Sequence, residues 1–130
     1  METVRDAMVP EPTTLSAGAS AQEAGEALMR PEVRAALVTS RGELVGVITR
    51  KTLVREVVAA GLDPRTVVLR DVAEPPHFTL EAGLGLEDGF HFLEEEDLER
   101  VPVVEDGRLV GVLSRAVVQR RLAEDETLDD

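Results

Sequence analysis

The stretch GELVGVITR at residues 42–50 recurs as GRLVGVLSR at residues 107–115, a displacement of 65 positions. The same displacement aligns further pairs outward from this stretch without a gap: Val38 with Val103, Thr14-Leu15 with Thr79-Leu80, Pro10 with Pro75, and Arg5-Asp6 with Arg70-Asp71. A self-similarity that extends over the whole unit predicts two copies of one supersecondary structure.

Each copy is predicted to form a helix, two strands and a second helix. In the first copy, Ser20 and Glu23 have capping-box spacing and open a helix that continues over 24–30, where Pro31 stops it. Strands are predicted over 35–39 and 43–48, joined by a turn in which Gly42 takes a positive φ. The apolar spacing from residue 51 predicts a second helix that ends at Gly61.

The second copy repeats this order, with helices predicted over 86–93 and 116–122 and strands over 101–104 and 108–113. Gly85 and Gly89 are expected to weaken its first helix by about 1 kcal/mol each relative to alanine. We therefore expect an α+β fold in which each sheet is covered by two helices, and two such units pack pseudo-twofold through their sheets because one is too small alone. The predicted boundaries are 1–64, 65–123 and a disordered acidic tail, 124–130.

Composition excludes several classes of function. The core is aliphatic, with no Trp, no Tyr and three Phe, which argues against recognition by base stacking. The absence of Cys rules out disulfides and thiolate chemistry. The net charge of −12, with 17 of the 26 acidic side chains in residues 66–130, opposes nucleic acid and anionic membrane as partners. Without an apolar run near the roughly 20 residues of a membrane span, we expect a soluble cytoplasmic protein.

Three features together resemble the cystathionine-β-synthase (CBS) domain: the Arg-Asp pair near the start of each unit, the strand RVPVV at 100–104, and Gly-x-x-x-Gly-x-x-Thr/Ser before a helix. The resemblance extends over about residues 4–122 and occurs twice. It implies a Bateman module, in which two repeats associate through their sheets and leave clefts between them. It also implies a homodimer, an adenosyl ligand such as AMP, ADP, ATP or S-adenosylmethionine, and a sensing role without catalysis.

The residues themselves suggest an anion site. Each return strand ends in a hydroxyl, Thr49 or Ser114, where a helix begins, so that the hydroxyl and free backbone N–H groups can face one anion. Six of the fourteen basic side chains lie in the two segments that follow: Arg50, Lys51, Arg55, Arg115, Arg120 and Arg121. The alternative is that the hydroxyls are ordinary helix caps and the basic residues are solvated helix faces.

The resemblance also implies that the two clefts differ. Nucleotide-binding repeats carry an Asp that grips the ribose three positions after the Thr or Ser, but this chain has Thr52 and Val117 there. Thr52 can offer one weaker hydrogen bond and Val117 none, so we expect at most one ligand per chain. The family contacts the base near Thr14 and Thr79. The candidate ligand-binding residues are Thr14, Val38, Thr49, Arg50, Lys51, Thr52, Thr79, Pro102, Val103, Ser114 and Arg115.

No catalytic or metal-binding set can be assembled from the sequence, since His77 and His91 are isolated and no nucleophile has a base beside it. The leading hypothesis is a regulatory module, without cofactor, that senses an adenine nucleotide between its repeats and acts on a regulated protein partner. The alternative is a ligand-free dimerisation or scaffold module that binds a partner protein.

Overall fold

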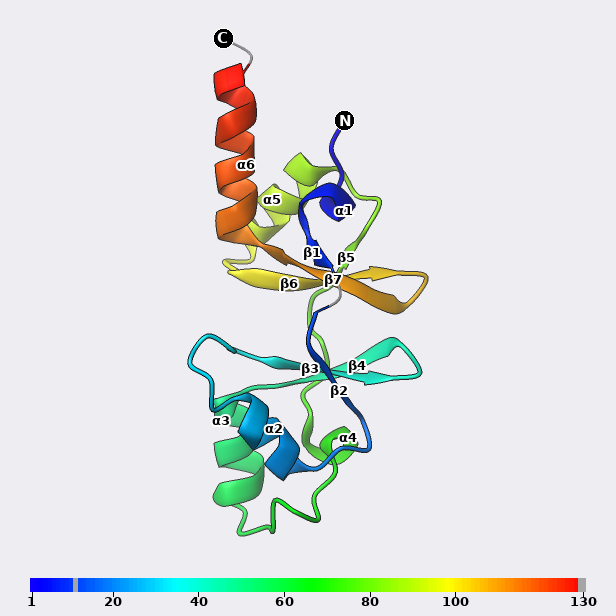
Figure 1. Ribbon diagram of the computed structural model, residues 1–130, viewed down its shortest axis with the longest axis vertical. Coiled ribbons are helices and arrows are strands. Elements are labelled where there is room, and N and C mark those ends of the chain that lie inside the picture. The colour runs from blue at the N-terminus through cyan, green and yellow to red at the C-terminus, as the bar shows by residue number, and fades with distance from the viewer. Residues whose placement is uncertain (11, 129–130) are drawn as a thin grey trace. The chain divides into compact units, whose positions relative to one another are not determined.

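The computed structural model describes residues 1–10 and 12–128 and confirms the α+β class (Figure 1). The chain forms two compact units. The central unit is Thr13–His77, and the split unit combines Met1–Pro12 with Phe78–Asp130. Each unit has its own hydrophobic core.

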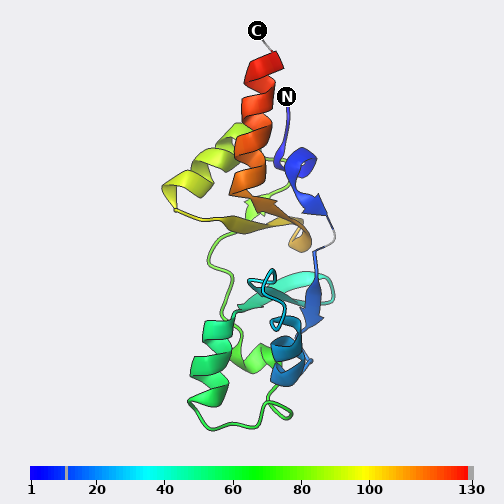
Figure 2. The same cartoon turned by 60° about the vertical axis from the view of Figure 1, so that its left-hand side comes forward.

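In the central unit, a parallel strand and an antiparallel hairpin form the sheet, in the order β2-β3-β4. Helices α2 and α3 lie together on one side of the hairpin (Figure 2). The elements, in chain order, are β2 (Thr14–Ser16), α2 (Ala21–Ala27), β3 (Ala36–Ser40), β4 (Glu43–Ile48), α3 (Arg50–Leu53), the π-helix η1 (Val54–Val58) and α4 (Leu69–Val72).

The split unit repeats this arrangement, with strands in the order β5-β6-β7-β1. Helices α5 and α6 pack against each other on one side of the β6–β7 hairpin (Figure 2). The elements, in chain order, are α1 (Val4–Ala7), β1 (Val9–Pro10), β5 (Leu80–Glu81), α5 (Leu86–Glu95), β6 (Arg100–Glu105), β7 (Arg108–Ser114) and α6 (Arg115–Leu128).

The β3–β4 and β6–β7 hairpins have the same turn conformation and the same irregularity in strand register. Gly42 has the expected positive φ, 84°, and its counterpart Gly107 has 79°. The residue before each glycine, Arg41 or Asp106, also has a positive φ, so both turns have the backbone that favours tight hairpins. The strand register also shifts at equivalent points, after Val38 in β3 and after Val103 in β6.

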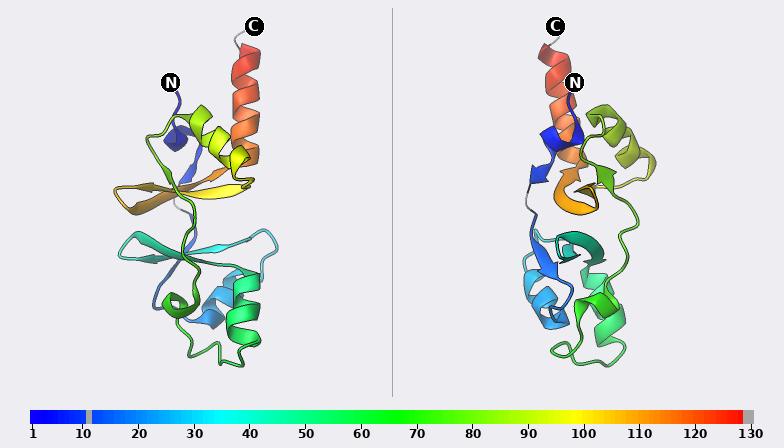
Figure 3. Two further views of the ribbon diagram at one scale, coloured as in Figure 1. Left: turned by 180° about the vertical axis from the view of Figure 1, so that it is seen from behind. Right: turned by 90° about the vertical axis from the view of Figure 1, so that its right-hand side faces the viewer.

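The compact units differ from the predicted boundaries 1–64 and 65–123, because the repeats exchange their first helices. Helix α1 begins the first repeat, yet Val4 is fully buried in the core of the split unit. Helix α4 begins the second repeat, yet Leu69 is fully buried in the core of the central unit. After α4 the chain crosses β4, where Glu74 pairs with Val47 (Figure 3); β1 pairs with β7 in the equivalent way.

Local signals of the first repeat are confirmed. Ser20 accepts a hydrogen bond from the Glu23 N–H, and Glu23 accepts one from the Ser20 N–H, as a capping box requires. Gly61 has φ 71° and donates to the Val58 carbonyl while Leu62 donates to Val57, the bonds of a glycine helix end.

Two expectations for the second repeat need correction. Gly85 is the N-cap of α5 and not an interior residue, and Gly89 is buried where an added Cβ would lie 3.0 Å from Val4 Cγ2. Gly89 therefore serves the packing of α1. The predicted disordered tail is also wrong for residues 124–128, which continue α6, whereas residues 129 and 130 lie outside the described residues.

Among residues 1–10 and 12–128, no helix combines the length and the apolar character that crossing a membrane requires.

Candidate ligand site

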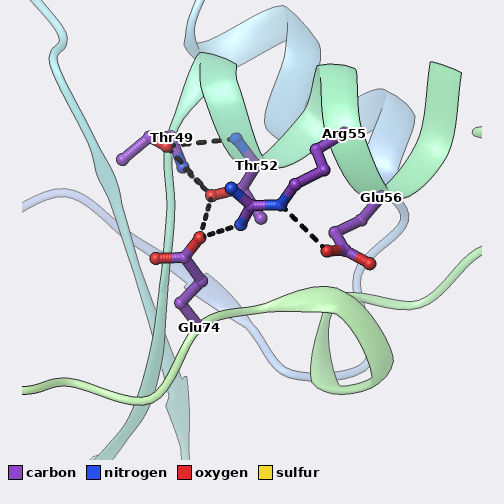
Figure 4. A network of polar contacts seen from close by, with 5 residues as sticks. All are labelled: Thr49, Thr52, Arg55, Glu56 and Glu74. Atoms are coloured by element: carbon purple, nitrogen blue, oxygen red, sulfur yellow. Dashed lines mark hydrogen bonds and ion pairs between the residues drawn. The ribbon is translucent and has the colours of Figure 1, made fainter. Parts of the chain in front are cut away.

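A capping box closes the junction between β4 and α3 in the central unit. The Thr49 hydroxyl accepts a hydrogen bond from the Thr52 N–H at 3.2 Å, and the Thr52 hydroxyl in turn accepts one from the Thr49 N–H at 3.4 Å. The two hydroxyl oxygens are 2.9 Å apart and share a further hydrogen bond (Figure 4). Thr49 is therefore a helix cap, as the alternative interpretation of the sequence held.

Thr52 connects this cap to a carboxylate from a distant part of the chain. Its side chain is fully buried, the one polar side chain buried to that degree among the described residues. The Thr52 hydroxyl donates to Glu74 Oε1 at 3.3 Å. Arg55 Nη2 forms an ion pair with the same oxygen, while Arg55 Nε donates to Glu56 at 3.1 Å (Figure 4). We call Thr49, Thr52, Arg55 and Glu74 the Glu74 cluster.

The cluster holds Glu74 in its ionised form. The hydrogen bond from Arg55 lowers the pKa of the Glu74 carboxyl, and the positive charge of Arg55 and the hydrogen bond from Thr52 act in the same direction. Conversely, hydrogen bonds to Glu56 and Glu74 raise the pKa of the Arg55 guanidinium. Glu74 is thus an acceptor without a proton to donate at neutral pH.

The basic side chains do not form the electropositive site that the sequence suggested. Most of them already have partners nearby, which satisfy their charge or their donors: Arg50 donates to the Arg30 carbonyl at 2.8 Å, Arg115 pairs with Asp97 at 3.3 Å, Arg121 pairs with Glu2 at 2.8 Å, and Arg55 pairs with Glu56 and Glu74. Of the six, Lys51 and Arg120 are exposed and have no ion pair within the described part of the chain.

The equivalent junction of the split unit has none of this network. The Ser114 hydroxyl makes no hydrogen bond with any described residue, and the Arg115 N–H is already bonded to the Glu99 carbonyl at 2.9 Å. Val117 stands where the central unit has Thr52, and Val9, which is 54% exposed, stands where it has Glu74. The predicted difference between the two repeats therefore extends beyond position 117.

The remaining candidates are divided between surface and core. Thr14 lies exposed on β2, Thr79 is exposed just before β5, and Pro102 is half-buried on β6. Val38 and Val103 are fully buried in their cores, so their side chains are packing residues and do not reach a surface where a ligand could lie.

Glu74 is the site residue that the sequence analysis missed. It lies 22 residues from Thr52, so no helical or strand spacing connects the two. A signal nevertheless existed, because the repeat places a charged residue at 74 opposite an apolar one at 9. A polar residue that breaks the apolar pattern of a repeat is a reason to look for a partner.

No group of three or more His, Cys, Asp or Glu side chains lies close enough to hold a metal ion in the part of the chain that the structure describes.

Comparison with known proteins identifies relatives of this chain. A family model described as "CBS domain" matches it twice, at residues 4–59 and 69–124. Hypoxic response protein 1 of Mycobacterium tuberculosis (strain ATCC 25618 / H37Rv) is 33% identical over 81 residues, which are 62% of this chain and 57% of that protein. The match thus covers less than two thirds of that relative.

Two solved structures share the fold over nearly their full length. Hypoxic Response Protein I with two coordinated zinc ions is 27% identical, with a TM-score of 0.78 over 93% of this chain and 99% of that one. CBSX2 in complex with AMP is 26% identical, with a TM-score of 0.77 over 97% of this chain and 99% of that one.

Proposed function

This chain belongs to the CBS domain family, and we propose that its CBS pair, a regulatory module, senses an adenine nucleotide without transforming it. The ligand class is AMP, ADP, ATP or S-adenosylmethionine, and the site is at the β4–α3 junction of the central unit. The observation that carries the proposal is the Glu74 cluster, which combines hydroxyls and an ionised carboxylate where the split unit has valines. The AMP complex of a relative with the same fold supports this ligand class.

The proposal favours one ligand per chain. Within the described residues, the exposed Lys51 side chain has no ion pair and can meet the charge of a phosphate, while the partly exposed Glu74 carboxylate provides an acceptor. The split unit has Arg120 without an ion pair but no hydroxyl at 117 and no carboxylate at 9. A metal ligand, as in the zinc-containing relative, has less support because no metal-binding cluster is found among the described residues.

Isothermal titration of the whole chain with AMP, ADP, ATP and S-adenosylmethionine tests the proposal. We expect at least one to bind with a Kd below about 1 mM and a stoichiometry of one per chain. Lys51→Ala should weaken this binding, whereas Arg120→Ala, which removes an exposed basic side chain from the split unit, should leave it unchanged. If the folded protein binds none of the four, nucleotide sensing is refuted.

A ligand-free dimerisation module is the second candidate, favoured by exposed apolar side chains on the central unit. Val54 and Val58 on η1 are 58% and 71% exposed, whereas the second repeat has Gln119 and Ala123 at these positions. A second copy of the chain would cover them. Sedimentation of Val58→Glu, with Ala123→Glu as the control, tests this candidate: only the first should dissociate a dimer. A protein that is monomeric at all concentrations contradicts it.

A further inference from the structure

The backbone of Glu74 is hydrogen-bonded to β4, although Glu74 lies in the segment that leads out of the central unit. Its N–H donates to the Val47 carbonyl at 3.0 Å, and its carbonyl accepts from the Val47 N–H at 2.8 Å. This pair of bonds attaches residue 74 to β4, two residues before Thr49 caps the following helix. The Glu74 side chain then points toward the start of α3 (Figure 4).

The carboxylate uses only one of its two oxygens inside the cluster. Oε1 accepts from Thr52 and from Arg55, whereas no described residue donates to Oε2. The side chain is 40% exposed, and Figure 4 shows the second oxygen directed away from both donors. An ionised carboxylate has about four lone-pair positions, so Glu74 retains capacity for further donors from solvent or a ligand.

Thr52, in contrast, cannot contact a ligand. Its side chain has no solvent exposure, and its hydroxyl already bonds to Thr49 and Glu74. The weaker hydrogen bond to a ribose that the sequence suggested for Thr52 is therefore not available in this arrangement. Thr52 and Arg55 are instead positioning residues, because both fix the carboxylate that is exposed.

The chemistry of the exposed Glu74 carboxylate limits which ligand groups it can bind. A carboxylate that accepts but does not donate is complementary to paired O–H donors, and bonds to charged groups are stronger than neutral ones. A vicinal diol offers two such donors side by side. Lys51, exposed on the neighbouring helix α3, is complementary to an anion. A molecule that has both a diol and an anionic group, such as a ribose phosphate, satisfies both.

We infer that Glu74 is the residue with which the central unit binds the ribose diol of its nucleotide, with Thr52 and Arg55 holding it in place. The inference rests on the proposed function and makes it more specific, since it names the group that distinguishes a ribonucleotide from a deoxyribonucleotide. It also predicts that the split unit, with Val9 and Val117 at the equivalent positions, has no equivalent ribose site.

Titration of the whole chain with AMP and with 2′-deoxy-AMP tests the inference. The unmodified protein should bind AMP about tenfold or more tightly than the deoxy compound, because one hydrogen bond to a charged group is lost. Glu74→Gln should weaken AMP binding by about tenfold and bring the two affinities within about twofold of each other. Glu56→Gln removes the other carboxylate that pairs with Arg55 and should retain the discrimination.

The outcomes separate the two proposals. If AMP binds but the unmodified protein does not discriminate against the deoxy compound, the role of Glu74 is refuted while nucleotide sensing stands, and this result needs no variant. The role of Glu74 is also refuted if Glu74→Gln prefers AMP over 2′-deoxy-AMP as strongly as the unmodified protein does. It is refuted as well if Glu56→Gln loses this preference to the same extent as Glu74→Gln. If none of AMP, ADP, ATP or S-adenosylmethionine binds, both proposals fail.

Discussion

The Thr52 hydroxyl donates a hydrogen bond to Glu74 Oε1 at 3.3 Å, across 22 residues of sequence. Thr52 is in the first repeat and Glu74 in the second, so this bond exists because the segment after α4 returns to β4. The bond connects a helix cap to an ionised carboxylate. It makes the central unit chemically different from the split unit despite their shared hairpins.

Removing the Thr52 hydroxyl should destabilise the protein. Thr52→Val keeps the shape of a fully buried side chain but removes the bonds to Thr49 and Glu74. We expect the free energy of unfolding to fall by about 1–2 kcal/mol, since each hydrogen bond contributes about 0.5–1.5 kcal/mol. Urea denaturation measures this. Val117→Ile, an apolar exchange at the equivalent position, is the control, and an unchanged midpoint for Thr52→Val would contradict the cluster.

Gly46 and Gly111 should not tolerate a side chain. A Cβ on Gly46 would lie 2.6 Å from Ala73 Cβ, and one on Gly111 would lie 2.8 Å from the Val9 carbonyl oxygen. Each Gly→Ala change should therefore displace the segment that packs on the glycine, which contains Ala73 at Gly46 and Val9 at Gly111. We expect the free energy of unfolding to fall by about 1–3 kcal/mol. Thermal unfolding followed by circular dichroism measures the loss. Gly83→Ala serves as the control, because a Cβ on Gly83 would have no neighbouring atom within 4 Å. Equal losses of stability at all three positions would contradict this packing.

Acid should remove the contribution of Glu74 to stability. Its pKa is lowered in the folded protein, chiefly by the hydrogen bond from Arg55, so the folded state favours the ionised form. The stabilisation is complete above the unfolded pKa of glutamate, about 4.3, and is lost as the pH falls through the lower folded value. The difference in melting temperature between the unmodified protein and Glu74→Gln should be constant near pH 7 and shrink below about pH 4.3. A difference that grows in acid would contradict this sign.

Leu69 should be essential to a core that lies outside its own repeat. The side chain is fully buried among Ala17, Val38 and Ile48 of the central unit. Leu69→Ala should cost about 2–5 kcal/mol because it leaves a cavity, as measured by urea denaturation. Val58→Ala, at a position 71% exposed, should change stability by less than about 0.5 kcal/mol. If Leu69→Ala were as mild as this control, the exchanged packing of α4 would be wrong.

Much of the fold was predictable because its signals are local. The turns at Gly42 and Gly107, the capping box at Ser20 and the glycine helix end at Gly61 each depend on a few adjacent residues, and all are present. The candidate site was less predictable. Thr49 and Thr52 were identified, but as direct ligands, whereas they form a cap and a support. Val38 and Val103 were included although they belong to the cores.

The sequence by itself determined that the chain is a tandem repeat, because a gapless displacement of 65 residues and the periodicity of each strand and helix can be read from neighbouring positions. Only the tertiary structure decided which repeat each first helix packs against, and with it the meeting of Glu74 with Thr52 and Arg55. The physical reason is that the apolar character of Val4 and Leu69 predicts that they are buried, but it does not specify in which of the two cores. The choice depends on the path of the chain and on close packing, such as Ala73 against Gly46, which no local spacing encodes.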